Sequence, residues 1–555
     1  MKGLLRRSSA VFQWRLYREI LAASERCPPS VHHETAYPLL SRHHVPQAFS
    51  FIPLSSSVAV YTKCASNGRP FQAWLYTKHT TQHKLLYEET LASSTLDVAL
   101  TRDGQFVTIN SNTRTDSEVH VMRTLDAQTG SCEPLLVRPR EEGVEYYMEH
   151  GHNDIFYILT NAPSGCYYKV MIAASHQPSS WTHYYQPPQG TVLLDLELYS
   201  GGLLLYCLKE GAPIVAALYP EHKQILVGDQ FTEVKGGGGH YNCSEWPVLF
   251  SSPTAPPTAT HIAGPPPTGD KGTQTASVHM ISPSNDRYCI ERREAVSTDG
   301  TQVPLTLCYQ RGALKGSNLN PVLVHVYGCY GECVPIGWQA EGLPLLERGW
   351  VMAYAHTRGG GERGRGWYHS GMAHNKHKTF QDLAACVASV QCDISQPRLT
   401  ALVGESAGAL PVGMFSNLWP HLLQAAILKV PLVNLCHALS DLSNYLACKD
   451  KLEFGGYPHG TRSEREHIAS ICPYSTLRPQ DYPAVYVRAS RNDEVIPFSG
   501  VVAYVRRLRE CGANVVFKVD SVHGHHDNGD AKERATNAAK QIMFLYKALQ
   551  LDIAE

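Results

Sequence analysis

The sequence predicts an all-β domain followed by an α/β domain in which helices cover both faces of a mostly parallel sheet. Short β-rich runs separated by turn signals fill residues 46–285, a pattern typical of a sandwich, barrel or propeller. From residue 286 to 555, apolar strands alternate with longer helical patterns, which indicates a parallel sheet. Near the boundary, 236–239 is all glycine and 253–267 is rich in proline, so both stretches are predicted to be loop or linker.

Several candidate strands lie in the β-rich region, each rich in β-branched or aromatic side chains. They are 59–62, 105–109, 118–122, 155–159 and 203–206. At about 40 to 50 residues per four-stranded blade, this region would hold roughly five propeller blades.

The α/β region opens with a hairpin signal at Asp299-Gly300. Its candidate strands are 322–326, 351–354, 399–403 and 484–487, and its candidate helices are 380–391, 498–511 and 530–549. This alternation predicts a sheet whose parallel strands end at one common edge, where an active site is expected.

Composition excludes other classes of protein. The chain has 555 residues, 43% of them hydrophobic, and 49 basic against 50 acidic side chains give a formal net charge of −1. This balance is typical of folded domains rather than disordered chains, and it offers no electrostatic reason to expect a nucleic-acid partner. No stretch approaches 18 uninterrupted apolar residues, so no transmembrane segment is predicted.

The cysteines and the N-terminal segment bear on the cellular compartment. Sixteen cysteines without regular dense spacing favour reduced thiols and a cytoplasmic location. Residues 1–45 form a segment that is either a targeting sequence or partly disordered. Five basic side chains precede its first acid, Glu19, and they are Lys2, Arg6, Arg7, Arg15 and Arg18. They suit a mitochondrial presequence as an alternative, and a basic surface helix explains them equally well.

The sharpest motif is Gly404-Glu405-Ser406-Ala407-Gly408. It lies between a buried-strand run and a helical pattern, which is the context of a G-x-S-x-G nucleophile elbow. Such a turn exposes the serine hydroxyl at the carboxyl end of the sheet. It also directs the Ala407 backbone N–H and the helix N-terminus toward the same point. We therefore expect Ser406 to be a nucleophile.

A serine needs a base to accept its proton and an acid to orient that base. In α/β hydrolases the acid follows the serine in the chain and the histidine comes last. Asp493 lies just after the strand 484–487, with Glu494 as its competitor. His525 is the favoured base and His526 the second choice in the cluster 523–526. A metal site at these histidines and Asp527 has no further ligand group to support it, so no metal or organic cofactor is predicted.

Further segments resemble the prolyl oligopeptidase family of serine hydrolases. They are Tyr327-Gly328-Cys329-Tyr330-Gly331, then Arg358-Gly359-Gly360-Gly361-Glu362 and Phe380-Gln381-Asp382, followed in order by the serine, aspartate and histidine motifs above. The resemblance implies an α/β-hydrolase domain capped by a β-propeller that admits only small or extended substrates. It also implies that Ser406, Asp493 and His525 form a triad, and that the Tyr327 hydroxyl and the Ala407 N–H form the oxyanion hole. Arg358 and Glu362 are expected to be structural.

The sequence departs from this family in three respects. Its β region is shorter than a seven-bladed propeller, which suggests truncation. Val495 stands where proline-cutting members have an arginine that holds the substrate backbone, and no tryptophan after Trp419 is present to stack on a substrate proline. Asp450 and Glu453 could instead receive a basic side chain, as in oligopeptidase B, although solvated surface acids are the expected explanation.

These features predict a serine-type endopeptidase that cleaves short peptides by acyl transfer. An esterase or thioesterase acting on small acyl substrates is an alternative, because these substrates need less binding energy. A largely non-catalytic protein that binds partners through its β domain is the alternative from another class. The expected partners are therefore a short peptide or small acyl substrate, together with any proteins bound by the β domain.

Overall fold

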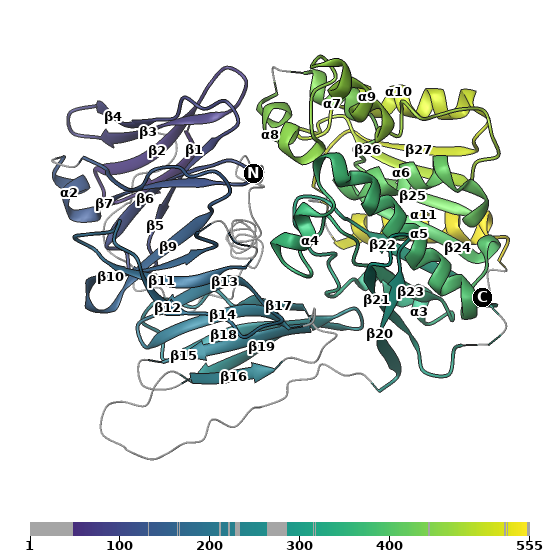
Figure 1. Cartoon of the computed structure of the whole chain (residues 1–555), viewed down its shortest axis with the longest axis horizontal. Coiled ribbons are helices and arrows are strands. Elements are labelled where there is room, and N and C mark those ends of the chain that lie inside the picture. Colours follow the sequence, from purple (N-terminus) through teal and green to yellow (C-terminus); the bar gives the residue numbers. More distant parts are fainter. Residues whose placement is uncertain are drawn as a thin grey trace.

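The computed structural model describes residues 48–551, apart from 131–132, 164, 166, 210–211, 220–222, 228–232, 264–285, 315, 317, 442–443, 527–528 and 530. The predicted N-terminal segment 1–45 therefore lies outside the described residues. Two halves of the chain lie side by side, an all-β half and an α/β half (Figure 1).

The β half consists of antiparallel sheets that follow one another in chain order around an arc (Figure 1). Among the described residues there are four sheets of four strands and one of three. The first two contain β1 (Ala48–Pro53), β2 (Val58–Cys64), β3 (Pro70–Thr77), β4 (Gln82–Glu88), β5 (Thr95–Leu100), β6 (Phe106–Asn112), β7 (Ser117–Arg123) and β8 (Leu135–Arg138). The third and fourth contain β9 (Tyr146–Gly151), β10 (Ile155–Thr160), β11 (Lys169–Ala174), β12 (Thr182–Tyr185), β13 (Thr191–Tyr199), β14 (Gly202–Lys209), β15 (Ala212–Leu218) and β16 (Lys223–Val227). The fifth contains β17 (Glu233–Gly236), β18 (Glu245–Ser252) and β19 (Ala255–Ala263).

These sheets are the blades of a β-propeller-type domain, and each packs its apolar face on the next. Val98 and Val107 of the second blade share a core with Val60 of the first, and Phe156 of the third packs with Phe106 of the second. One prediction was wrong here. Part of the proline-rich stretch predicted as linker is the strand β19, which pairs along its length with β18. Pro256 and Pro257 lie at the break in register between the pairs Phe250–Thr258 and Ser252–Ala255, where the hydrogen-bonded ladder is interrupted and their missing N–H groups are tolerated.

The α/β half is built on one sheet of eight strands in the order β20-β21-β23-β22-β24-β25-β26-β27. The strands are β20 (Tyr288–Val296), β21 (Gln302–Gln310), β22 (Val322–Val326), β23 (Val351–Ala355), β24 (Thr400–Glu405), β25 (Ala425–Lys429), β26 (Ala484–Ser490) and β27 (Val515–Asp520). The hairpin β20–β21 is antiparallel, and the strands from β23 to β27 are parallel. The predicted sheet of parallel strands is thus present.

Helices cover both faces of this sheet (Figure 1). The helices are α2 (Thr124–Thr129) in the β half and then α3 (Leu343–Leu346), α4 (Arg365–His369), α5 (Lys376–Asp393), α6 (Ala409–Leu418), α7 (Leu435–Ser440), α8 (Tyr445–Phe454), α9 (Arg462–Ser470), α10 (Phe498–Glu510) and α11 (Ala531–Ala548). Single 3-10 turns are η3 (His152–Asp154), η4 (Ala340–Gly342), η5 (Ala373–Asn375), η6 (Pro397–Leu399), η7 (Ser406–Gly408) and η8 (Pro420–Leu422). α5, α6 and α10 share one core with the sheet, and α3 and α11 share the core on its other face. No described helix is long and apolar enough to span a bilayer.

A buried ion pair fastens the glycine-rich loop after β23 to α5. Arg358 donates hydrogen bonds to Asp382 through Nε at 2.9 Å and through Nη2 at 2.6 Å, and it also contacts Asp299 of the β20–β21 turn. Glu362 accepts a hydrogen bond from the Val334 backbone N–H at 2.8 Å. Both side chains therefore hold loops together, in agreement with the structural roles expected for them.

Candidate active site

The turn after β24 holds Ser406 in a left-handed backbone conformation with φ of +55°, which is costly for a residue with a side chain. The turn also needs glycines on both sides of the serine. A Cβ at Gly404 would lie 2.2 Å from the carbonyl oxygen of Gly408, and one at Gly408 would lie 2.7 Å from the carbonyl oxygen of Val326. Because these are backbone atoms, they cannot rotate away. The sequence therefore forms the predicted sharp turn, with Ser406 at the carboxyl end of the sheet.

Three side chains from separate loops meet at this edge. The Nε2 atom of His525 lies 2.9 Å from the Oγ atom of Ser406. The Nδ1 atom of the same ring lies 2.9 and 2.8 Å from the two carboxylate oxygens of Asp493. All three side chains are almost completely buried, at 4% exposure for Ser406, 2% for His525 and 3% for Asp493. The arrangement can transfer a proton from the serine to an imidazole that a carboxylate orients.

The backbone around Asp493 fixes the direction of this carboxylate. Its Oδ1 atom accepts hydrogen bonds from the backbone N–H groups of Val495 at 2.9 Å and Ile496 at 2.8 Å. Glu494, the competing acid, instead accepts the backbone N–H of His525 at 3.1 Å. Glu494 therefore supports the histidine loop, while Asp493 contacts the imidazole ring.

The other histidines of the cluster have different surroundings. The ring of His526 stands edge-on to that of His525, with 5.2 Å between centroids, and His523 Nε2 lies 3.2 Å from a carboxylate oxygen of Glu533. Asp527, the fourth member of the metal site considered above, lies outside the described residues. Within the described part of the chain, no group of three potential ligands could hold a metal ion.

Tyr327 and Ala407 adjoin the nucleophile. Tyr327 directly follows β22, and this strand pairs in parallel with β24, which leads to Ser406. The Cα and Cδ2 atoms of Tyr327 would lie 3.1 Å from a Cβ at Gly408, so the ring packs against the elbow. Ala407 is buried in the first turn after the strand. Both residues thus adjoin the elbow that carries Ser406.

A small pocket of about 30 Å³ opens beside the triad. Apolar side chains make up most of its wall: Leu432, Leu435, Ala438, Leu439, Leu446, Ala447, Val495 and Ile496. Its polar lining consists of Ser406 and His525 of the triad together with Arg114, Tyr330, Asn444, Asp450 and His526. Arg114 belongs to the turn between β6 and β7, so the β half contributes to a pocket of the α/β half. Sequence reasoning missed this residue, because no motif marks a side chain that enters the site from another domain.

Asp450 and Glu453 are not solvated surface acids, and this expectation was wrong. Glu453 is fully buried, and it accepts hydrogen bonds from Lys376 Nζ at 2.7 Å and the Tyr368 hydroxyl at 2.8 Å. Asp450 accepts a hydrogen bond from Arg114 Nη2 at 2.5 Å. Because both carboxylates are already paired with cations, neither offers a free negative charge to a basic substrate side chain.

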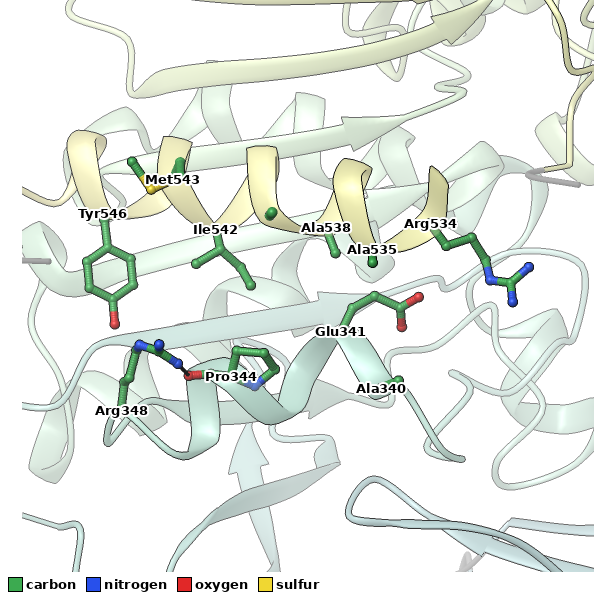
Figure 2. Close-up of a pocket in the computed structure, with 11 residues that line it drawn as sticks. Ala340, Glu341, Pro344, Arg348, Arg534, Ala535, Ala538, Ile542, Met543 and Tyr546 are labelled. Atoms are coloured by element: carbon green, nitrogen blue, oxygen red, sulfur yellow. Dashed lines mark hydrogen bonds between the residues drawn. The ribbon is translucent and has the colours of Figure 1, made fainter. Parts of the chain in front are cut away.

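A second, larger cavity of about 460 Å³ lies between α11 and the segment η4–α3 (Figure 2). Ile542 and Met543 line it from α11, and Pro344 lines it from α3. Glu341, Arg348 and Arg534 also line it. No serine, cysteine or histidine is among the described residues of its wall. The chemistry of the molecule is therefore assigned to the smaller pocket at the triad.

Comparison with known proteins agrees with this geometry. A family model described as "Prolyl oligopeptidase family" matches residues 339–552, and one described as "Prolyl oligopeptidase, N-terminal beta-propeller domain" matches residues 73–262. The chain is 30% identical over 498 residues to a prolyl endopeptidase-like protein of Xenopus laevis, covering 85% of this chain and 68% of that protein. It is also 30% identical over 537 residues to the prolyl endopeptidase-like protein of Gallus gallus, covering 91% and 70%.

Solved structures show the same fold. Oligopeptidase B from Trypanosoma brucei, with covalently bound antipain in a closed form, superimposes with a TM-score of 0.81 at 25% identity, covering 91% of this chain and 73% of that chain. Oligopeptidase B from Leishmania major gives a TM-score of 0.79 at 24% identity, covering 89% and 71%. The likeness extends over both halves of the chain.

Replacing Gly404 by alanine is expected to disrupt the elbow, because the added Cβ meets a backbone oxygen at 2.2 Å. The free energy of unfolding should fall by about 2 kcal/mol or more, as in other overpacked sites. Urea denaturation followed by circular dichroism measures this change. Gly342→Ala is the matched control, since its Cβ would meet only the flexible end of Met352, at 3.4 Å. Equal stability of the two variants would contradict the steric explanation.

Proposed function

Because the chain belongs to the prolyl oligopeptidase family of serine peptidases, we propose that it cleaves short peptides by acyl transfer through Ser406, His525 and Asp493. The observation that carries this proposal is the unbroken hydrogen-bonded chain from serine to imidazole to carboxylate. The three residues follow three different strands of the sheet, so it is the fold, and not their order in the sequence, that brings them together.

In the proposed reaction the Ser406 hydroxyl attacks the carbonyl carbon of the scissile bond. The Nε2 atom of His525 accepts the hydroxyl proton as the new C–O bond forms. The imidazolium then donates this proton to the amide nitrogen, and the C–N bond breaks to leave an acyl-enzyme. Water enters, loses a proton to His525 and attacks the acyl carbon. The proton returns to Ser406 as the acid product leaves.

Asp493 stabilises the imidazolium that forms in both steps. It does so as a carboxylate whose orientation is set by two backbone N–H groups. The negative charge on the carbonyl oxygen needs its own donors, and we assign these to the Tyr327 hydroxyl and the Ala407 N–H. The position of both residues beside the elbow supports this assignment. Preorganised donors of this type are a large source of rate acceleration.

The preference for short peptides is supported by how deeply the serine lies. The β half contacts the α/β half next to the pocket, through Arg114 with Asp450, Lys449 with Thr95 Oγ1 at 2.7 Å, and Arg365 with Glu145. Together with the low exposure of Ser406 and His525, these contacts leave little space for a folded protein. A short peptide is therefore the substrate that the site accommodates.

A fluorophosphonate probe is expected to label Ser406, because such probes react only with an activated serine. Ser406→Ala should abolish labelling. His525→Ala and Asp493→Asn should slow it by about a thousandfold or more, as for other triads. Intact-protein mass spectrometry measures the added mass and its rate.

His526→Ala is the matched control for the histidine variant, since its ring stands edge-on to that of His525, and it is His525 whose Nε2 lies 2.9 Å from the serine Oγ atom. If both histidine variants lost labelling equally, the loss would reflect a disturbed fold of the histidine loop and not the removal of one specific base. A folded wild-type protein that does not react would reject the serine chemistry.

Tyr327→Phe is expected to slow acylation by about a hundredfold, the usual effect of removing one oxyanion donor. The ring and its packing on the elbow are retained in this variant, so stability should change little. Stopped-flow measurement of an activated ester or anilide gives the rate. Tyr354→Phe removes another buried hydroxyl on the neighbouring strand β23 and should leave the rate unchanged. Equal rates for wild type and Tyr327→Phe would remove this residue from the oxyanion hole.

Peptide length provides a test of the substrate class. A fluorescence-quenched octapeptide is expected to be hydrolysed, whereas reduced, unfolded casein should remain uncut over the same time, because the buried serine admits only short chains. Gel electrophoresis and fluorescence follow the two reactions, with Ser406→Ala as the blank. Efficient cleavage of casein would contradict the limit on length.

A further inference from the structure

Arg114 occupies the turn between β6 and β7, and its neighbours fix this turn. The Thr113 hydroxyl accepts the backbone N–H groups of Thr115 and Asp116, each at 3.1 Å. The Arg140 guanidinium in turn holds the Asp116 carboxylate at 2.5 Å. The β half therefore presents Arg114 on a rigid support.

The guanidinium of Arg114 lies in the pocket of the nucleophile and is only 4% exposed. It stacks over the ring of Tyr330, with 4.3 Å between Cζ and the ring centroid. Its Nη2 atom donates to Asp450 Oδ1, and the Tyr330 hydroxyl donates to the other oxygen of this carboxylate at 3.2 Å. Burial alone would lower the pKa of Arg114, but Asp450 together with the neighbouring phenols of Tyr330 and Tyr368 outweighs this effect and raises it. The group is thus a permanent cation beside the serine.

Two nitrogens of this cation have no acceptor. Among the described residues, neither Nε nor Nη1 of Arg114 has a hydrogen-bond partner, although both are buried. A guanidinium carries five N–H donors, and leaving such donors unsatisfied is costly. Other buried nitrogens of the described residues also lack a partner, among them Nε of Arg365, but the two of Arg114 belong to a side chain that lines the pocket of the nucleophile, where a substrate acceptor would satisfy them.

We propose that Arg114 is a substrate-binding residue that donates hydrogen bonds to a backbone carbonyl oxygen of the peptide on the acyl side of the scissile bond. This inference rests on the proposed peptidase function and adds the group that holds the substrate. Val495 stands where the family resemblance places an arginine in proline-cutting members, and it lines the same pocket. In this protein Arg114 of the β half binds the substrate backbone instead.

The local charges select this type of ligand. An acidic group beside Arg114 would also lie near the Asp450 carboxylate, and like charges in a buried site repel strongly. A basic group would meet the Arg114 cation, while Asp450 is already paired. A carbonyl oxygen accepts from Nε or Nη1 without adding charge. Most of the remaining wall is apolar, and its other polar members, including Asn444 and His526, add no carboxylate or lysine.

Paired covalent probes test this inference. The first probe is an acetyl-alanyl-alanine diphenyl phosphonate, and the second replaces its upstream amide by an E-alkene. The alkene keeps the shape but lacks both the carbonyl oxygen and the N–H, so the Arg114→Met variant is needed to assign the difference to the carbonyl. Diisopropyl fluorophosphate, which has no peptide part, reports the serine alone. In the wild type, the amide probe should inactivate about tenfold faster than the alkene probe, the worth of a hydrogen bond to a charged group.

In Arg114→Met the difference between the two peptidyl probes should disappear, while the reaction with diisopropyl fluorophosphate stays within about twofold. Arg365→Met is the matched control: it also removes an inter-domain ion pair, with Glu145, but Arg365 does not line the pocket. It should retain the tenfold difference. Because equal rates of the two peptidyl probes in the wild type would already contradict the proposal, it can be tested even if Arg114→Met fails to fold.

Equal rates for the two peptidyl probes in the wild type would overturn the proposal, as would an undiminished difference in a folded Arg114→Met protein. A wild type that reacts with diisopropyl fluorophosphate but with neither peptidyl probe would also reject it, while leaving the serine chemistry intact. A wild type that fails to react even with diisopropyl fluorophosphate would reject the proposed function, and the role of Arg114 with it.

Discussion

The close approach of backbone at the turn after β24 is the constraint on which the site depends. The chain reverses there so tightly that Gly404 and the carbonyl of Gly408 nearly touch, and Ser406 must adopt a left-handed conformation. Parallel strands then bring the other groups to the same edge. Tyr327 follows β22, Asp493 lies in the loop after β26, and His525 lies in the loop after β27. Because parallel strands end together, residues that are distant along the chain become neighbours without any special connection between them.

Beside this edge, cations and carboxylates are buried in pairs. Lys376 and Glu453 are both fully buried, and the pKa of Lys376 is raised because the neighbouring Cys329 thiol and Glu453 outweigh the effect of burial, which alone would lower it. Burial and the neighbouring charge of Asp450 likewise raise the pKa of Tyr330, so its phenol keeps the proton that it donates. Breaking such a pair leaves an uncompensated charge, which costs far more than the pair contributes when it is intact. These groups therefore have a fixed geometry next to the nucleophile.

Much of the fold and the triad region could be predicted because their signals are local. The elbow is five consecutive residues with a steric requirement, and β22 was predicted with the bounds 322–326 that the structure has. The helices α7, α8 and α9 were not predicted, and the first two supply much of the pocket wall. α8 has no apolar stripe of helical period that would reveal it. The roles of Asp450 and Arg114 depend on a contact between domains, and no local pattern encodes such a contact.

The two halves of the molecule join through polar groups rather than through a shared core. Each hydrophobic cluster of the described residues belongs entirely to one half of the chain. Contacts between the halves include the ion pairs Arg114–Asp450 and Arg365–Glu145. When an ion pair separates into water, its charges regain much of the hydration free energy that they lost on burial. Apolar surfaces regain no such free energy when they are exposed to water. The interface therefore holds Arg114 firmly over the pocket when closed, yet it opposes separation less than an apolar contact of equal area would. A serine that is 4% exposed needs such an interface, because its substrate must enter before the pocket can hold it.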